Sequence, residues 1–61
     1  MNIERVKHIM RKQQISAYGL SHLTGLSESL LSKYFHNVLH PKIDKIKKIA
    51  EALKVDFREL I

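Results

Sequence analysis

The chain has 61 residues and no cysteine, so it has room for one domain and cannot form a disulfide or a thiolate metal site. Its formal net charge of +5 favours a polyanionic partner, although a basic protein without such a partner carries the same charge. No apolar run approaches the roughly 18 residues that span a membrane, and the N-terminus lacks the apolar core of a signal peptide. We therefore expect residues 1–61 to form a single cytoplasmic domain.

The first helix is predicted over residues 3–13, where apolar side chains recur at helical spacing. These side chains are Ile3, Val6, Ile9 and Met10. Asn2 comes directly before them and can cap the helix, because its side-chain oxygen can accept a hydrogen bond from an amide of the first turn. The charged residues of the segment then lie on the other faces, in solvent.

A second, shorter helix is predicted to begin after Ser16, which is a suitable N-cap residue. Leu20 and Leu23 are expected on its inner face. Thr24 and Gly25 end the helix, since glycine adopts a positive φ angle without the penalty of a Cβ atom. A residue of this kind allows a sharp turn into the next helix.

The third helix is predicted to start after Ser27, whose hydroxyl can accept from an amide of the first turn. Leu31, Tyr34 and Phe35 follow at helical spacing and are expected to face inward. Asn37 is the best candidate for a left-handed residue that closes the helix. Two short helices joined by a glycine turn are typical of a helix-turn-helix, which presents its second helix to the major groove of DNA.

A loop over residues 38–41 precedes a fourth, strongly amphipathic helix. The apolar residues that define this helix are Ile43, Ile46, Ile49, Ala50 and Leu53. Asp56 and Glu59 have the spacing of a capping box and predict a short fifth helix. The apolar side chains of this last helix are Phe57, Leu60 and Ile61. The chain is therefore predicted to be all-α, with five helices and no strand.

With these elements in place, the chain resembles the phage-repressor and Cro family, also called the xenobiotic-response-element class. The resemblance covers nearly all of the chain. In the helix-turn-helix it rests on Leu20, Gly25, Leu26, Ser27, Leu31 and Tyr34. In the second half it rests on Pro41, Ile46, Ile49, Ala50, Leu53, Val55 and Leu60. It implies a five-helix, lambda-repressor-like domain that binds double-stranded DNA as a sequence-specific transcriptional regulator.

By analogy with that family, four residues of the third helix are candidates for contact with base edges. They are Glu28, Ser29, Ser32 and Lys33. Lys33 can donate to guanine or to a phosphate, and the two serines can donate or accept. Glu28 can accept from cytosine, and it can equally be an acid that the dipole of the helix start stabilises. The serines, Lys33 and His36 share one stripe of the helix, because they follow the spacing i, i+3, i+4, i+7.

Contacts with the DNA backbone are expected from the flanks of this helix. The candidates are Ser16, Tyr18, His36, Asn37, Lys42 and Lys45. A solvated surface position is favoured for three other lysines, namely Lys47, Lys48 and Lys54. The family usually has a glutamine that contacts a phosphate where this chain has Ala17, so that contact is absent here.

A small repressor of this kind is expected to bind a palindromic operator as a homodimer, because one recognition helix reads only a few base pairs. Leu60 and Ile61, at the apolar C-terminal end, are the candidate dimer interface. The alternative is a protein-interaction module on the same fold, such as an antitoxin or an antirepressor, with a regulatory protein as its partner. Ala17 and the acidic Glu28 favour this alternative.

Neither catalysis nor a metal ion or other cofactor is expected. The sequence groups no nucleophile, base and acid together. His36 and His40 have a spacing that can bind a metal on one helix face, but Asn37 and Pro41 interrupt a helix there. No cysteine or nearby acid completes such a site.

Overall fold

The computed structural model describes all 61 residues and contains four α-helices, one turn of 3-10 helix and no strand. The elements are α1 (Ile3–Gln13), α2 (Ala17–Thr24), α3 (Glu28–Phe35), α4 (Ile43–Leu53) and the 3-10 turn η1 (Phe57–Glu59). The prediction of an all-α chain is confirmed, as is the first helix over residues 3–13. The count of five helices is not confirmed, since the last element is a single 3-10 turn.

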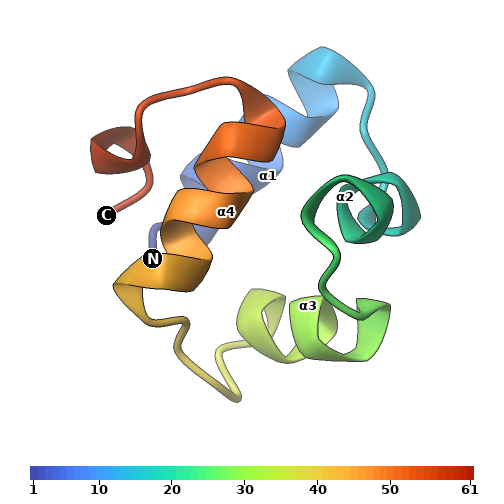
Figure 1. The fold of residues 1–61 in the computed structure, drawn as a ribbon, viewed down its shortest axis with the longest axis vertical. Coiled ribbons are helices and arrows are strands. Elements are labelled where there is room, and N and C mark those ends of the chain that lie inside the picture. The colour runs from blue at the N-terminus through green and yellow to red at the C-terminus, as the bar shows by residue number, and fades with distance from the viewer.

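The helix α4 is the central element of the fold (Figure 1). It crosses in front of α1 in this view, and it also contacts α2 and η1. The helices α2 and α3 contact each other to one side of α4 and are joined by a tight turn. The two termini lie close together, and the amide of Asn2 donates a hydrogen bond to the carbonyl of Leu60. No helix is both long enough and apolar enough to cross a membrane.

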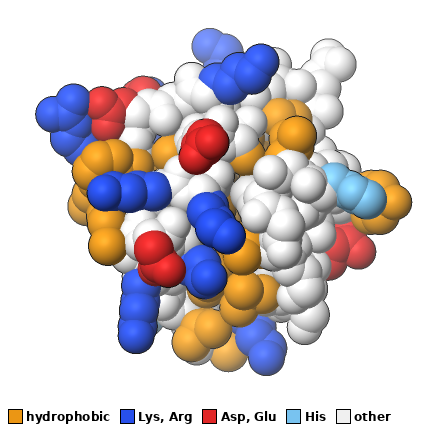
Figure 2. All heavy atoms as spheres, in the orientation of Figure 1, with side chains coloured by type: hydrophobic (Ala, Val, Ile, Leu, Met, Phe, Trp, Pro, Cys, Tyr) orange, Lys and Arg blue, Asp and Glu red, His pale blue; other side chains and the backbone are white.

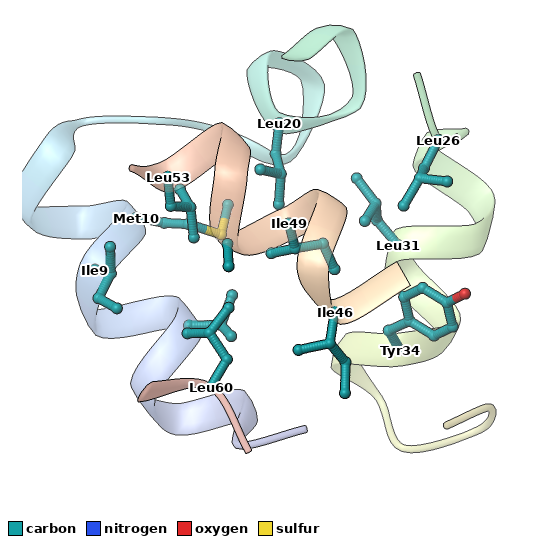
Figure 3. Packing of buried hydrophobic residues seen from close by; sticks show 12 residues of the cluster. Ile9, Met10, Leu20, Leu26, Leu31, Tyr34, Ile46, Ile49, Leu53 and Leu60 are labelled. Carbon is teal, nitrogen blue, oxygen red and sulfur yellow. The ribbon is translucent and has the colours of Figure 1, made fainter. Parts of the chain in front are cut away.

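Twelve buried residues, all of them hydrophobic, form the core between the helices (Figure 3). The helix α4 supplies four of them from one face, as its amphipathic pattern predicted. These four are Ile46, Ile49, Ala50 and Leu53. Leu20 of α2 and Leu31 of α3 are fully buried in the same cluster as Ile49 of α4, so both helices of the predicted helix-turn-helix contribute to one core.

Two side chains that were predicted to face inward are exposed instead. Leu23 is 59% exposed, and Ile43 is 49% exposed. In α2 the side chains of Ser21 and Thr24 are turned toward the α2–α3 connection, which leaves Leu20 as the only buried residue of that helix. Leu23 therefore lies on the outer edge of α2. Ile43 is the first residue of α4 and lies at the margin of the core.

The C-terminal residues also differ from prediction. Leu60 is 0% exposed and is a core residue, held in place by the hydrogen bond between its carbonyl and the amide of Asn2. Because Leu60 does not reach the surface in this conformation, Ile61 is the better placed of the two candidates for a dimer interface, which stays a prediction. Ile61 is 66% exposed and stays a candidate for that interface.

The predicted capping box before η1 does not form. The Oδ1 atom of Asp56 accepts from the amide of Arg58 at 2.9 Å. The carboxylate of Glu59, which a capping box would direct back to Asp56, instead pairs with Arg5 of α1 at 3.0 Å. The amide of Leu60 then bonds to a carbonyl three residues earlier, which is the hydrogen-bond pattern of a 3-10 turn.

Side chains close the starts of the first three α-helices, as predicted. The Oδ1 atom of Asn2 and the Oγ atoms of Ser16 and Ser27 each accept from an amide three residues further on, at 3.0, 3.1 and 3.1 Å respectively. Each bond satisfies one of the amides that a helix start leaves without a partner. The start of α4 is different, because its N-cap residue Lys42 makes no such side-chain hydrogen bond.

Hydrogen bonds from two side chains fix the turn between α2 and α3. Ser21 Oγ donates to the carbonyl of Leu26 at 2.5 Å, and Thr24 Oγ1 donates to the carbonyl of Leu20 at 2.8 Å. The amide of Leu26 in turn donates to Thr24 Oγ1 at 3.1 Å. Gly25 has a φ angle of 76°, the left-handed conformation predicted for it. This network sets the position of α3 relative to α2.

Candidate nucleic-acid interface

The helix α3 has one face in the core and the opposite face in solvent. Leu31 and Tyr34 are 0% and 3% exposed, and their burial sets the rotation of the helix about its axis. The exposed side carries all four candidates for contact with base edges. These are Glu28, Ser29, Ser32 and Lys33. The structure therefore brings the four side chains together on one surface of a helix of eight residues.

The candidates for phosphate contact lie on three segments around α3. Ser16 and Tyr18 are at the start of α2, His36 and Asn37 at the end of α3, and Lys42 and Lys45 at the start of α4. All of them are exposed except Lys45, which is half-buried. Asn37 has a φ angle of 57°, as predicted for the residue that closes α3.

The model of one protein family, described as the Cro/C1-type HTH DNA-binding domain, matches residues 5–61. The chain belongs to this family. No curated protein and no solved structure shows a significant match to it. The family predicted from the sequence is thus confirmed, and the chain is a DNA-binding domain whose helix-turn-helix is formed by α2 and α3.

In this Cro/C1-type domain the ring of His36 is hydrogen-bonded to the backbone of α3. Its Nδ1 atom lies 2.8 Å from the carbonyl oxygen of Ser32 and 3.3 Å from the Oγ atom of the same residue. A carbonyl oxygen only accepts, so Nδ1 carries the hydrogen and donates it. In the neutral ring Nε2 is then an acceptor, and it has no hydrogen to give to a phosphate.

At the start of α2 both phosphate candidates are oriented by neighbours. The ring centroids of Tyr18 and His22 are 4.5 Å apart with an interplanar angle of 69°, which is the favoured edge-to-face arrangement. Ser16 Oγ accepts from the amide of Gly19, and its hydroxyl hydrogen is left free to donate to a phosphate. The sequence did not predict the contact between His22 and Tyr18.

At the start of α4 the two lysine candidates border a small pocket of about 240 Å³. The residues that line it are Tyr34, Leu39, His40, Lys42, Asp44 and Lys45. Two lysines and a histidine face one acid there, so the pocket carries a net positive charge at neutral pH. The free amides of the first turn of α4 add to this field, because the start of a helix is the positive end of its dipole.

The lysines of the domain are not neutralised by acids within the chain. Both ion pairs of the structure involve arginine, and no lysine takes part in either. Lys33, Lys42 and Lys45 are therefore available to an external anion. Lys47 instead has a partner within the chain, because its Nζ atom lies 5.0 Å from the centroid of the Phe57 ring in a cation–π contact. Figure 2 shows lysine and arginine side chains spread over the face on which α4 lies, with fewer acids among them.

Sequence reasoning missed three polar side chains in this region. Ser21 and Thr24 hold the turn before α3, and the presence of two hydroxyl residues beside Gly25 was the signal that could have identified them. Tyr34 was assigned to the core alone. Its hydroxyl was the signal, because a buried tyrosine usually finds a partner for this group.

No group of three or more side chains with metal-binding atoms is brought together.

Proposed function

We propose that this Cro/C1-type domain is a sequence-specific transcriptional repressor, which binds a palindromic operator through α3 as a homodimer. The observation that supports this most directly is the exposed face of α3. It presents Glu28, Ser29, Ser32 and Lys33 while Leu31 holds the opposite face in the core. Side chains that donate and accept hydrogen bonds on one helical surface are what a reader of the major groove requires.

The proposal separates contacts that read bases from contacts that position the protein. Lys33 is suited to guanine, whose O6 and N7 atoms both accept hydrogen bonds. Lys42 and Lys45 are suited to the backbone, because they stand beside the positively charged start of α4. Phosphate contacts fix the register of the protein on the duplex and carry no sequence information themselves.

The size of the domain and of its expected site supports the homodimer. One recognition helix covers only part of an operator, and paired half-sites lie roughly 34 Å apart. The domain measures 24 × 23 × 19 Å, so two copies side by side on one face of the duplex fit this spacing. Ile61, exposed and apolar at the C-terminal end, is the proposed contribution of each copy to their contact.

The test is selection of bound duplexes from a random pool at physiological salt. We expect a two-fold-symmetric motif to be enriched, with binding about 10³-fold or more above that of unrelated DNA. Binding without enrichment would contradict the sequence-specific repressor. No binding to any duplex would favour the alternative of a protein-interaction module.

Substitution of single lysines tests the placement of the interface. Lys42→Ala should weaken binding to all duplexes and lower the slope of log affinity against log salt by about 1. Lys33→Ala should weaken binding to the selected duplex and relax the preference for one base pair of each half-site. Lys48→Ala removes the same charge from the exposed side of α4 outside the proposed interface, and it should leave the slope closer to that of the parent. If all three variants behave alike, only net charge matters and the proposed interface is wrong.

A further inference from the structure

Tyr34 is a core residue whose hydroxyl oxygen makes no hydrogen bond within the chain. The residue is 3% exposed, and its ring packs among the buried side chains of α3 and α4 (Figure 3). Its hydroxyl group has no hydrogen-bond partner within the chain. Every side-chain oxygen or nitrogen that is fully buried does have a partner. The small exposed part of Tyr34 must therefore include the hydroxyl oxygen.

Tyr34 is also one of the residues that line the pocket at the start of α4. Tyr34 is the only buried residue among those that line this pocket of about 240 Å³. Figure 3 shows the oxygen at the end of the ring that is directed away from Ile46 and Ile49, out of the core. The ring therefore reaches from the core to the pocket and presents a polar atom there.

The lining of the pocket, taken as a whole, carries more positive than negative charge. Lys42, Lys45 and His40 line the pocket against the single acid Asp44. The first two amides of α4 have no partner, since Lys42 supplies no capping side chain. Burial and then the charge of Asp44 raise the pKa of Tyr34, so its hydroxyl keeps its hydrogen at neutral pH. A protonated hydroxyl among cations and free amides can donate to an anionic oxygen.

We propose that the Tyr34 hydroxyl donates a hydrogen bond to a phosphate of the DNA backbone, which lies in the pocket at the start of α4. This inference rests on the proposed function and adds a DNA-contacting residue that the sequence had placed in the core alone. The contact couples the core to the DNA, because the same ring that fixes the rotation of α3 also fixes the donor. Tyr34 is thus a positioning residue for the recognition helix.

The variant Tyr34→Phe removes this one oxygen and leaves the ring in place. We expect it to bind the selected duplex about 10-fold less tightly, as for the loss of a hydrogen bond to a charged acceptor. A scrambled duplex of the same length should lose affinity by a similar factor, since a phosphate contact does not depend on sequence. The salt slope should be unchanged, because tyrosine carries no charge. Fluorescence anisotropy over a range of salt concentrations measures all three quantities.

Two further measurements separate the contact from a structural role. The midpoint of urea unfolding should be the same for parent and Tyr34→Phe, because the hydroxyl has no partner within the chain. A set of duplexes with a single neutral methylphosphonate at successive positions should contain one position per half-site at which Tyr34→Phe causes no further loss. That position identifies the phosphate that Tyr34 contacts.

The outcomes also separate this inference from the proposed function. If the parent binds the selected duplex and Tyr34→Phe binds it equally well, the inference fails and the repressor proposal stands. A loss of affinity that comes with a lower unfolding midpoint, or that no methylphosphonate position removes, also overturns the inference. If the parent binds no duplex, both proposals fail together.

Discussion

The starts of α3 and α4 are built in opposite ways. At α3 the Oγ atom of Ser27 accepts from an amide of the first turn at 3.1 Å, so this start is closed by the chain itself. At α4 the N-cap residue is Lys42, which makes no side-chain bond and borders a pocket with positive charge. A closed start stabilises the fold, whereas an open one leaves amides for a ligand.

The same difference in hydrogen bonding distinguishes the α2–α3 turn from the start of α4. Around the α2–α3 turn the hydroxyl groups of Ser21 and Thr24 are already bonded to the backbone, and they hold α3 in place. Around the start of α4 the polar groups face outward without partners. Substitutions in the turn should therefore act on the free energy of unfolding, and substitutions at the start of α4 should act on DNA binding.

The largest expected effect on stability is that of Gly25→Ala. Gly25 has a φ angle of +76°, and a Cβ atom added there would meet no other atom within 4 Å. The cost is thus one of backbone conformation alone, about 1–2 kcal/mol of unfolding free energy. Urea unfolding of parent and variant measures it, and DNA affinity corrected for the folded fraction should be unchanged.

Gly19→Ala is the matched control, because this glycine lies within α2 and has no positive φ. A Cβ atom at Gly19 would lie 3.5 Å from Ser16 Oγ, an ordinary van der Waals contact. Alanine should therefore stabilise α2 by up to about 1 kcal/mol. If the two variants shift the unfolding free energy in the same direction, the turn does not depend on the left-handed conformation of Gly25.

Lys42→Ser should change stability and DNA binding in opposite directions. The φ and ψ angles of Lys42 are −77° and 167°, which suit a serine N-cap. A serine there should raise the unfolding free energy by about 0.5–1 kcal/mol, while the loss of the cation lowers the slope of log affinity against log salt by about 1. Lys42→Ala is the control, because it removes the same cation without adding a cap. Equal unfolding free energies for the two variants would show that the first turn of α4 has no unpaired amide that a serine cap can satisfy.

Local features of the fold were predictable from the sequence because they depend on neighbouring residues alone. The caps at Asn2, Ser16 and Ser27 were predicted from side chains that can reach an amide three residues away. The left-handed residues Gly25 and Asn37 were predicted from the tolerance of glycine and asparagine for that conformation. The burial of the apolar face of α4 followed from its spacing, since a stripe of this width has one stable position against a core.

Features that depend on distant segments could not be predicted in the same way. Leu23 was assigned to the core by spacing, but the rotation of α2 is set by hydrogen bonds of its turn. Leu60 was assigned to an interface because it is apolar and close to the C-terminus, yet it fills a space beside the start of the chain. The unpaired hydroxyl of Tyr34 is visible only once α3 and α4 are placed together. In the candidate interface, sequence spacing therefore predicted which residues share a face, and not which polar atoms are left without partners.

The smallest expected effect concerns Asp56, whose carboxylate caps the start of η1 and can titrate. Hydrogen bonds from the side chain and the backbone amide of Arg58 lower the pKa of Asp56 to about 2, from its ordinary 3.8. Since the pKa is lower in the folded state, the stabilisation is complete above the ordinary value and is lost as the pH falls through this range. The pair is exposed and local, so the effect on unfolding should be small.

The measurement is the thermal unfolding midpoint of the parent and of Asp56→Asn between about pH 5 and pH 2, a window set by the cited shift. Asparagine keeps an oxygen that can cap η1 but cannot titrate, so it preserves the cap and removes the proton equilibrium. The difference between the two midpoints should shrink as the pH falls, because protonation of Asp56 removes the advantage of the parent. A difference that is constant with pH would mean that the bonds to Arg58 are equally present in the unfolded chain, as their separation of two residues allows. The caps at Ser16 and Ser27 do not titrate, so acid should affect η1 while leaving the helix-turn-helix closed.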